Sequence, residues 1–243
     1  VSGCARTGAE PTGLRHGPSD LRSMRVVVVG CGAVGAATTS VLAREGHDVI
    51  ALDRFGIPNG VGSSHGRSRI FRVAYHEGET YVPLLRRSLA AWRALDRTRD
   101  RPGALFRRTG SLTVGPRGSD VVVGARETCE HHDIDHETLS GAEVGERFPA
   151  WDLDADYLAV FQRDGGVLDP ERCLTALVES AQAAGATVRG NVRVDSVTET
   201  GGGVRVGSSD GTYEADRVVV AAGPWASSLL PELDNLLTVT RHV

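Results

Sequence analysis

Residues 25–53 read RVVVVGCGAVGAATTSVLAREGHDVIALD, and this stretch decides the fold. The run Val26–Val29 is β-branched throughout, which is typical of a strand buried on both faces of a parallel sheet. It leads directly into Gly30, Gly32 and Gly35, at the G-x-G-x-x-G spacing of a dinucleotide-binding turn. The stretch therefore predicts a strand, a glycine-rich turn and a helix that bind a nucleotide together.

Each part of this turn has an expected task. Gly30 allows the sharp turn, Gly32 lets the backbone approach a pyrophosphate, and Gly35 lets the helix pack closely against the strand. Ala33 and Val34 open the helix, whose positive N-terminus is suited to phosphate, so both are expected cofactor contacts. The helix is predicted to run to about Glu45, and a glycine turn without any ligand is the alternative.

Asp53 indicates which nucleotide is bound. It ends the second predicted strand, Asp48–Leu52, and lies 53 − 35 = 18 residues after the last glycine. A carboxylate there accepts hydrogen bonds from a ribose 2′-hydroxyl and repels a 2′-phosphate. FAD or NAD is therefore expected rather than NADP, and Arg54 is a further expected cofactor contact.

A second apolar run lies near the other end of the chain. Residues 215–225 read ADRVVVAAGPW, which predicts a buried strand that ends in small residues, where backbone can approach a flavin. Gly223 and Trp225 are the cofactor contacts expected there. An ordinary core strand followed by a Gly-Pro turn explains the same residues, and both interpretations stay open at this point.

Residues 62–92 carry a family resemblance. They read GSSHGRSRIFRVAYHEGETYVPLLRRSLAAW, and they resemble the family of monomeric sarcosine oxidase and N-methyltryptophan oxidase, within the D-amino-acid-oxidase-like flavoenzymes. The resemblance is most specific at residues 63–72 and 77–92. It implies an α/β fold, with a Rossmann-like FAD-binding domain and an inserted, incomplete α+β substrate domain.

The resemblance also implies site residues. His65 and Arg69 match positions beside the flavin ring, and Arg72 matches the position that holds the substrate carboxylate, a task suited to a planar guanidinium. Further implied cofactor contacts are Ser63, Ser64 and the backbone at Val194. From the residues alone, Arg69 and Arg72 as a solvated helical face and His65 as a structural loop histidine are the alternatives.

The implied function is an FAD-dependent oxidoreductase that oxidises a secondary amine or N-methyl amino acid, such as sarcosine, with O₂ to give an imine and hydrogen peroxide. The cofactor supplies this chemistry and the protein places the substrate. Val73 and His76 depart from the sarcosine oxidase pattern, so the amine stays open. The alternatives are a glycine or D-amino acid oxidase, a dehydrogenase of the same fold, and an inactive truncated nucleotide-binding remnant.

Patterning divides the chain into segments. The expected divisions are a disordered tail at 1–23, an FAD-binding part at 24–103, an inserted substrate part at 104–165, a second FAD-binding part at 166–233 and the start of a truncated substrate domain at 234–243. The expected helices cover about residues 80–96, 120–131 and 170–184, with another opened by a Ser140–Glu143 capping box. The expected strands cover about residues 111–114, 134–138, 191–197, 204–207 and 236–243.

Composition narrows the class of protein. The net charge of −4 argues against a nucleic-acid surface, and no apolar run approaches the roughly 18 residues of a membrane span. The four cysteines show no paired spacing, so a cytoplasmic protein is expected. His131, His132 and His136 favour a solvated helix end over a metal site. The expected partners are an amino acid and O₂, and the full-length enzyme is expected to be a monomer.

Overall fold

The parallel sheet predicted from the first motif is the centre of the structure, a computed structural model that describes residues 23–76, 78–101 and 103–240. Its strands are β1 (Arg25–Val29), β2 (Asp48–Leu52), β9 (Thr187–Arg189) and β13 (Arg217–Val220). They lie in the order β13-β1-β2-β9 and pair in parallel throughout. The β-branched run of β1 is buried between two neighbouring strands, as its composition predicts.

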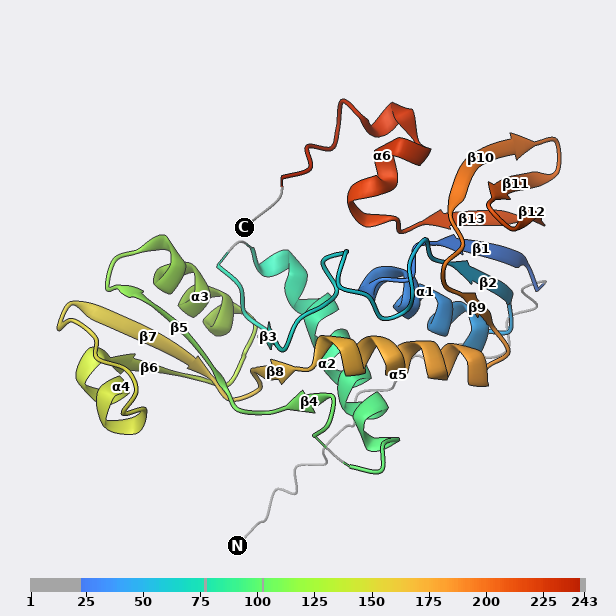
Figure 1. The fold of residues 1–243 in the computed structure, drawn as a ribbon. Coiled ribbons are helices and arrows are strands. Elements are labelled where there is room, and N and C mark those ends of the chain that lie inside the picture. The colour runs from blue at the N-terminus through green and yellow to red at the C-terminus, as the bar shows by residue number, and fades with distance from the viewer. Residues whose placement is uncertain (1–22, 77, 102, 241–243) are drawn as a thin grey trace, which may run out of the picture.

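The two faces of this sheet are covered differently (Figure 1). Helices α1 (Ala33–Arg44) and α5 (Pro170–Ala183) pack on one face, where Val26, Val28 and Ala36 belong to one apolar cluster. The other face packs against a meander of three antiparallel strands, β10 (Val194–Thr200), β11 (Gly203–Ser208) and β12 (Gly211–Ala215). Helices on one side and strands on the other bury the centre of the sheet from both sides.

A second lobe holds an antiparallel sheet (Figure 1). Its strands are β5 (Ser111–Pro116), β6 (His136–Ser140) and β7 (Tyr157–Gln162), with β7 in the middle. Helices α3 (Asp120–His131) and α4 (Gly141–Arg147) accompany them.

A small sheet lies between the lobes (Figure 1). It consists of β3 (Arg69–Phe71), β8 (Gly166–Leu168) and β4 (Phe106–Arg107), with β8 in the middle. The remaining elements are α2 (Val82–Arg97), α6 (Ala226–Leu229) and the 3₁₀ turns Glu79–Tyr81, Gly223–Trp225 and Pro231–Leu233. Within the described stretches, no helix is both long and apolar enough to span a lipid bilayer.

The strongest sequence signals place their elements correctly. The Rossmann-like parallel sheet is confirmed, and the helix predicted over 120–131 is α3. Asp169 caps α5 by accepting a hydrogen bond from the Arg172 backbone N–H at 3.0 Å, with Pro170 as the first helical residue. Gly46 ends the first helical segment with φ +89°. These signals are local, so tertiary packing does not override them.

Several predicted strands were wrong in position or character. The strand predicted at 134–138 is observed as β6, which begins two residues later. Asp133 has a left-handed backbone at φ 49°, and the Ile134 side chain is buried in an apolar cluster with residues of α3. Asn191, at φ 60°, delays β10 to Val194.

Two further expectations concern the end of the chain. The strand β13 is half-buried and not buried, because it forms an edge of the sheet. Residues 236–240 form no strand, and residues 241–243 lie outside the described residues. Of the tail predicted at 1–23, residues 1–22 also lie outside the described residues.

The interpretation of Arg69 and Arg72 as one helical face is wrong, because Arg69 begins β3.

The predicted capping box is present at the start of α4. Ser140 Oγ accepts from the Glu143 backbone N–H, and Glu143 accepts from the Ser140 backbone N–H at 2.7 Å. We expect Ser140→Ala to lower the free energy of unfolding by about 1 kcal/mol, measured by urea titration. Glu143→Gln retains the geometry of the box and is the matched control.

Acid should weaken the same box. The hydrogen bonds that Ser140 donates to the Glu143 carboxylate hold the pKa of Glu143 below its usual range. A lowered folded-state pKa means that the stabilisation is present at neutral pH and is lost as the pH falls through that lowered value. A Ser140→Ala effect that grew with acidification would contradict this assignment.

Candidate functional site

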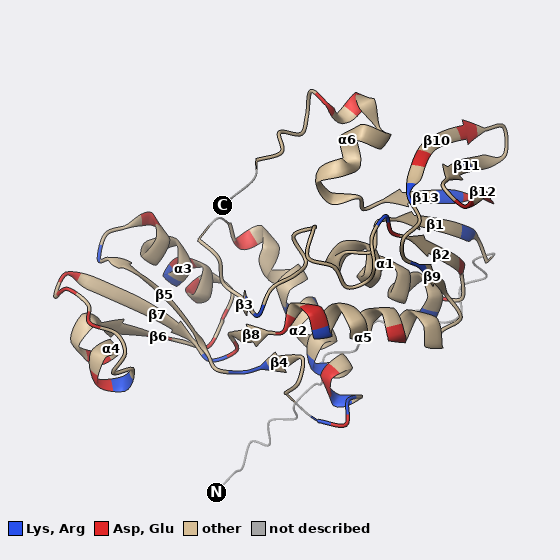
Figure 2. Cartoon of the chain, in the orientation of Figure 1, with Lys and Arg blue, Asp and Glu red and all other residues tan. Residues whose placement is uncertain are grey.

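A cavity of about 620 Å³ lies where the glycine turn, the end of β2 and the start of β10 meet. The segment that follows β13 and the loop at residues 59–64 close its other sides. The cavity is lined by Gly30, Gly32, Ala33, Val34, Asp53, Arg54, Ser63, Ser64, Val194, Gly223 and Trp225. Every predicted cofactor contact except Gly35 therefore reaches one space. The end of β1 and the first turn of α1, which face it, carry no charged residue (Figure 2).

The three glycines of the turn meet different surroundings. A Cβ on Gly35 would lie 1.8 Å from the Gly30 carbonyl oxygen, and a Cβ on Gly30 would lie 2.4 Å from the Ala221 carbonyl oxygen. Gly30 also has φ +94°, which favours glycine. A Cβ on Gly32 would meet only the Ser64 side chain, at 3.0 Å. Gly30 and Gly35 therefore permit backbone packing, whereas Gly32 keeps the surface of the cavity bare.

Asp53 has a structural task that the sequence did not reveal. Its carboxylate accepts hydrogen bonds from the backbone N–H groups of Cys31, at 2.7 Å, and Phe55, at 2.9 Å. The residue is only 9% exposed, yet it lines the cavity. An ionised carboxylate has about four acceptor sites, so these two bonds leave capacity for a ribose hydroxyl. Asp53 thus braces the glycine turn from the position where it would hold a nucleotide.

The loop after β2 is tied to the helix that follows the glycine turn. Ser64 Oγ accepts a hydrogen bond from the Ala33 backbone N–H at 2.9 Å, which satisfies one unpaired donor at the start of α1. The N-cap residue of α1, Gly32, has no side chain to do this. Arg69 Nη2 donates to the Ser63 carbonyl oxygen at 2.6 Å, so β3 holds the same loop from its other side.

The three predicted catalytic residues lie outside the lining of this cavity. His65 and Arg69 are exposed, and Arg72 is half-buried. The Arg72 guanidinium lies over the Tyr75 ring, 4.3 Å from its centroid. All three belong to the continuous segment that runs from the cavity loop through β3. His65 follows the lining residue Ser64, and Arg69 donates to the lining residue Ser63. Arg72 lies three residues further along the chain.

Two lining features were missed from sequence. Phe55 and Trp225 pack with ring centroids 5.6 Å apart, and they join the β2 end to the segment after β13. Asn59 organises the loop, because its side chain accepts from the Val61 backbone N–H at 3.0 Å and donates to the Gly56 carbonyl at 3.0 Å. The Asn-Gly pair at residues 59–60 is typical of a turn and was the available signal.

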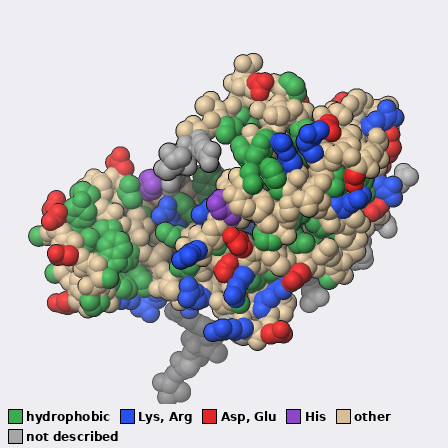
Figure 3. All heavy atoms as spheres, in the orientation of Figure 1, with side chains coloured by type: hydrophobic (Ala, Val, Ile, Leu, Met, Phe, Trp, Pro, Cys, Tyr) green, Lys and Arg blue, Asp and Glu red, His purple; other side chains and the backbone are tan. Residues whose placement is uncertain are grey.

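The candidate histidines lie at a surface acid. His131 Nδ1 and His132 Nε2 approach Glu79 Oε2 at 3.1 and 3.5 Å, and His136 contacts the Ile134 carbonyl. In the part of the chain that the structure describes, no group of three or more His, Cys, Asp or Glu side chains could hold a metal ion. Arginine and acidic side chains are interspersed on the face shown in Figure 3.

Cys31, inside the glycine turn, should resist alkylation. Burial, together with the nearby Asp53 carboxylate, raises the pKa of its thiol to about 12. At about pH 8 its thiolate fraction is then roughly 1,000-fold below that of an ordinary thiol. We expect iodoacetamide to leave Cys31 unmodified in the folded protein, as judged by peptide mass spectrometry. The urea-unfolded protein is the control, and equally fast labelling in both states would refute the prediction.

Known proteins share this sequence and architecture. The family model described as FAD dependent oxidoreductase matches residues 25–243. Monomeric sarcosine oxidase of Bacillus sp. (strain B-0618) is 36% identical over 210 residues, which cover 86% of this chain and 53% of that enzyme. N-methyl-L-tryptophan oxidase of Yersinia pestis (strain Pestoides F) is 35% identical over 209 residues, which cover 86% and 56%. The chain therefore spans about half the length of these curated relatives.

A solved structure shows a similar fold. NikD, described as an unusual amino acid oxidase essential for nikkomycin biosynthesis, superposes with a TM-score of 0.76 at 35% sequence identity. The match covers 87% of this chain and 54% of NikD.

Proposed function

The chain belongs to the family of FAD-dependent oxidoreductases, and from this premise we propose that it binds FAD and serves the oxidation of a secondary amine or N-methyl amino acid by O₂. The cavity at the glycine turn is the single observation that carries the proposal. It joins a bare backbone at Gly32, the N-terminus of α1 and the Asp53 carboxylate in one space. These groups fit a pyrophosphate and a ribose that carries a free 2′-hydroxyl.

The residues present fit the adenosine and pyrophosphate portions of FAD. Backbone N–H groups at the start of α1 would face the phosphates, and the backbone at Val194 would approach the adenine. Bound FAD would accept a hydride equivalent from the amine, and O₂ would take up the two electrons to give hydrogen peroxide while water hydrolyses the imine. The substrates we propose are N-methyl amino acids such as sarcosine.

Arg72 would act on the substrate, whereas His65 and Arg69 would lie beside the flavin ring. Arg72 would bind the substrate carboxylate through its guanidinium, with the aromatic face of Tyr75 supporting that side chain. Arg69 keeps the cavity loop in place through Ser63, and with His65 it would flank the flavin ring. Within residues 65–72, the N-terminal part would thus bind the cofactor, and Arg72 at the C-terminal end would bind the substrate.

The test begins with an absorbance spectrum of the purified protein, in which flavin bands support FAD binding. Titration should show FAD binding more tightly than NADP, and the reverse order would contradict the proposal. Peroxide release is then measured with sarcosine, N-methyltryptophan, glycine and proline. Turnover of the secondary amines sarcosine, N-methyltryptophan or proline, without turnover of the primary amine glycine, supports the proposed class. A protein with neither flavin bands nor FAD affinity would be a non-catalytic remnant.

Arg72→Ala should weaken carboxylate binding without displacing the flavin. Losing a charge-assisted hydrogen bond costs about 1.5–3 kcal/mol, which is roughly a 10- to 150-fold rise in KM. Arg69→Ala should instead shift the flavin spectrum, because it frees the Ser63 loop. Arg67→Ala, an exposed arginine of the same loop, is the matched control. Unchanged KM in Arg72→Ala with a shifted spectrum would reverse the two roles.

A second candidate is an amino acid oxidase with a different substrate, which the similarity to NikD favours. Val73 and His76, close to Arg72 in sequence, would then set the difference in substrate. Glycine turnover without sarcosine turnover would support it. We further propose that the protein is a monomer. We also propose that it is cytoplasmic, which the free buried thiols of Cys31, Cys129 and Cys173 support.

A further inference from the structure

Gln162, the last residue of β7, is completely buried. Its side-chain oxygen accepts from the backbone N–H groups of Val73, at 3.1 Å, and Ala74, at 2.8 Å. Its side-chain nitrogen donates to the Ala74 carbonyl oxygen at 3.1 Å. One side chain therefore satisfies three buried backbone groups of a distant segment.

An amide is suited to this task. Two N–H donors and one carbonyl acceptor need a partner that both accepts twice and donates, and a glutamine side chain offers both functions at one end. Buried backbone groups left without partners are costly, so the segment at Val73 and Ala74 depends on Gln162 for its conformation. β3 ends at Phe71, so at Val73 and Ala74 the hydrogen bonds to Gln162 take the place of strand pairing.

That segment adjoins Arg72. On the N-terminal side of Arg72, Phe71 is the last residue of β3 that pairs with β8, opposite Gly166. On its C-terminal side, Val73 and Ala74 are held by Gln162. The Arg72 backbone is therefore fixed on both sides, by a strand ladder before it and by a buried amide after it.

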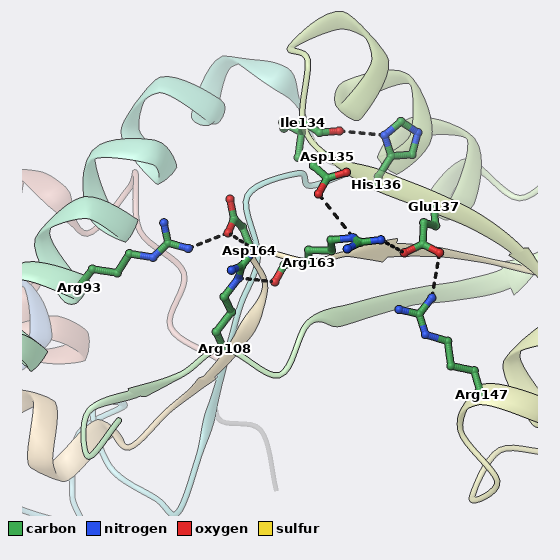
Figure 4. A network of polar contacts seen from close by, with 9 residues as sticks. All are labelled: Arg93, Arg108, Ile134, Asp135, His136, Glu137, Arg147, Arg163 and Asp164. Atoms are coloured by element: carbon green, nitrogen blue, oxygen red, sulfur yellow. Dashed lines mark hydrogen bonds and ion pairs between the residues drawn. The ribbon is translucent and has the colours of Figure 1, made fainter. Parts of the chain in front are cut away.

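The end of β7 is itself held firmly (Figure 4). Asp164 pairs with Arg93 of α2 at 2.6 Å and with Arg108 at 3.1 Å. Arg163 pairs with Glu137 of β6 at 3.1 Å, and Glu137 also binds Arg147. Individual exposed pairs contribute little, but this network ties the residues that follow Gln162 to several elements. The Gln162 side chain therefore extends from a part of the backbone that is held in place.

We propose that Gln162 is a positioning residue that sets the carboxylate affinity of Arg72 by holding the backbone at Val73 and Ala74. This inference rests on the proposed function, in which Arg72 binds a substrate carboxylate. Gln162 is not among the residues that line the cofactor cavity. Its influence passes through the main chain between Arg72 and Tyr75.

The test is a double-mutant cycle in the FAD-loaded protein. The probe is methoxyacetate, which has the shape and carboxylate of N-methylglycine but no amine to oxidise, and its binding is followed by flavin absorbance. Gln162→Met keeps the length of the side chain and removes its three hydrogen bonds, so affinity should fall about tenfold. In an Arg72→Met background the same change should alter affinity less than about twofold, because coupled residues are not additive.

Matched measurements separate positioning from general damage. Thr113→Val on the neighbouring strand β5 removes a buried hydroxyl that has no hydrogen-bond partner among the described residues, and it should leave affinity unchanged. FAD content should be equal in all variants. If Gln162→Met does not fold, Gln162→Asn, whose amide is too short to reach both backbone groups, is used in its place and should weaken binding in the same direction.

The outcomes are distinct. If the wild-type protein binds methoxyacetate and Gln162→Met binds it equally well, the positioning role is wrong while the proposed function stands. An equal loss in the wild-type and Arg72→Met backgrounds also overturns it, because the effect would then not pass through Arg72. If the FAD-loaded wild-type protein binds no methoxyacetate, the carboxylate anchor itself fails, and the proposed function fails with it.

Discussion

Gly32→Val should abolish FAD binding while the apoprotein stays folded. The Cβ position of Gly32 faces the cavity and meets only the Ser64 side chain, so the branched valine would occupy the space where phosphate meets backbone. Losing two charge-assisted hydrogen bonds at the start of α1 costs about 3–6 kcal/mol, a loss of roughly 150-fold or more in affinity. FAD titration measures the affinity, and thermal unfolding of the apoprotein measures the fold.

Two other glycines, Gly35 and Gly60, provide the comparison with Gly32. Gly35→Ala should damage folding as well as binding, because its Cβ would lie 1.8 Å from the Gly30 carbonyl oxygen, which is backbone and has no room to move. Gly60→Ala should change neither property, since no heavy atom of the described residues beyond its two chain neighbours lies within 4 Å of its Cβ position. Normal FAD affinity in Gly32→Val would show that the phosphates do not pass this turn.

Asp53→Ala should lower both stability and FAD affinity. Its carboxylate is the partner of two backbone N–H groups, at Cys31 and Phe55, and the first of these is buried. An unsatisfied buried donor costs about 1–3 kcal/mol and the loss of an ordinary hydrogen bond about 0.5–1.5 kcal/mol, so the free energy of unfolding should fall by about 1.5–4.5 kcal/mol. Chemical denaturation of the apoprotein measures this part without any contribution from the cofactor.

Asp53→Asn separates the two roles. The asparagine side-chain oxygen still accepts one of the two hydrogen bonds, so about half of the stabilisation by Asp53 should remain. The charged acceptor for the ribose 2′-hydroxyl is lost. Equal stability of Asp53→Ala and the wild-type protein would mean that the glycine turn holds its shape without this carboxylate. The sequence predicted only the nucleotide contact of Asp53, and its bond to Cys31 appears only in the fold.

The accuracy of the sequence predictions follows the range of the interactions involved. The α5 cap at Asp169 and the α4 capping box depend on neighbours within a few residues, and their patterns predict them. The glycine spacing predicts the turn itself, whereas the contacts of that turn with Asp53 and Ala221 come from distant residues. The strands β4, β8 and β9 have only two or three residues, too few to show a period. Their pairing comes from distant partners, so no local pattern marks them.

The candidate site shows the same division. Glycine spacing and the Asp53 position predict which residues meet in the cavity, because the βαβ unit fixes that geometry. Gln162 has no such signal: a single glutamine at the end of a strand shows neither spacing nor periodicity. Its role depends on Val73 and Ala74, which lie 88 to 89 residues earlier in the chain. Only the folded chain brings them together.

The order of the parallel sheet also bears on biosynthesis. β1 pairs with β13, and Val26 lies opposite Arg217, so the ribosome must add 191 residues after Val26 before its partner is made. At about 5–20 residues per second a ribosome needs roughly 10–40 s for that length. Residues 221–225, which form one wall of the cavity, emerge after β13. The nucleotide site is therefore completed late, and the nascent chain must keep β1 from other partners until then.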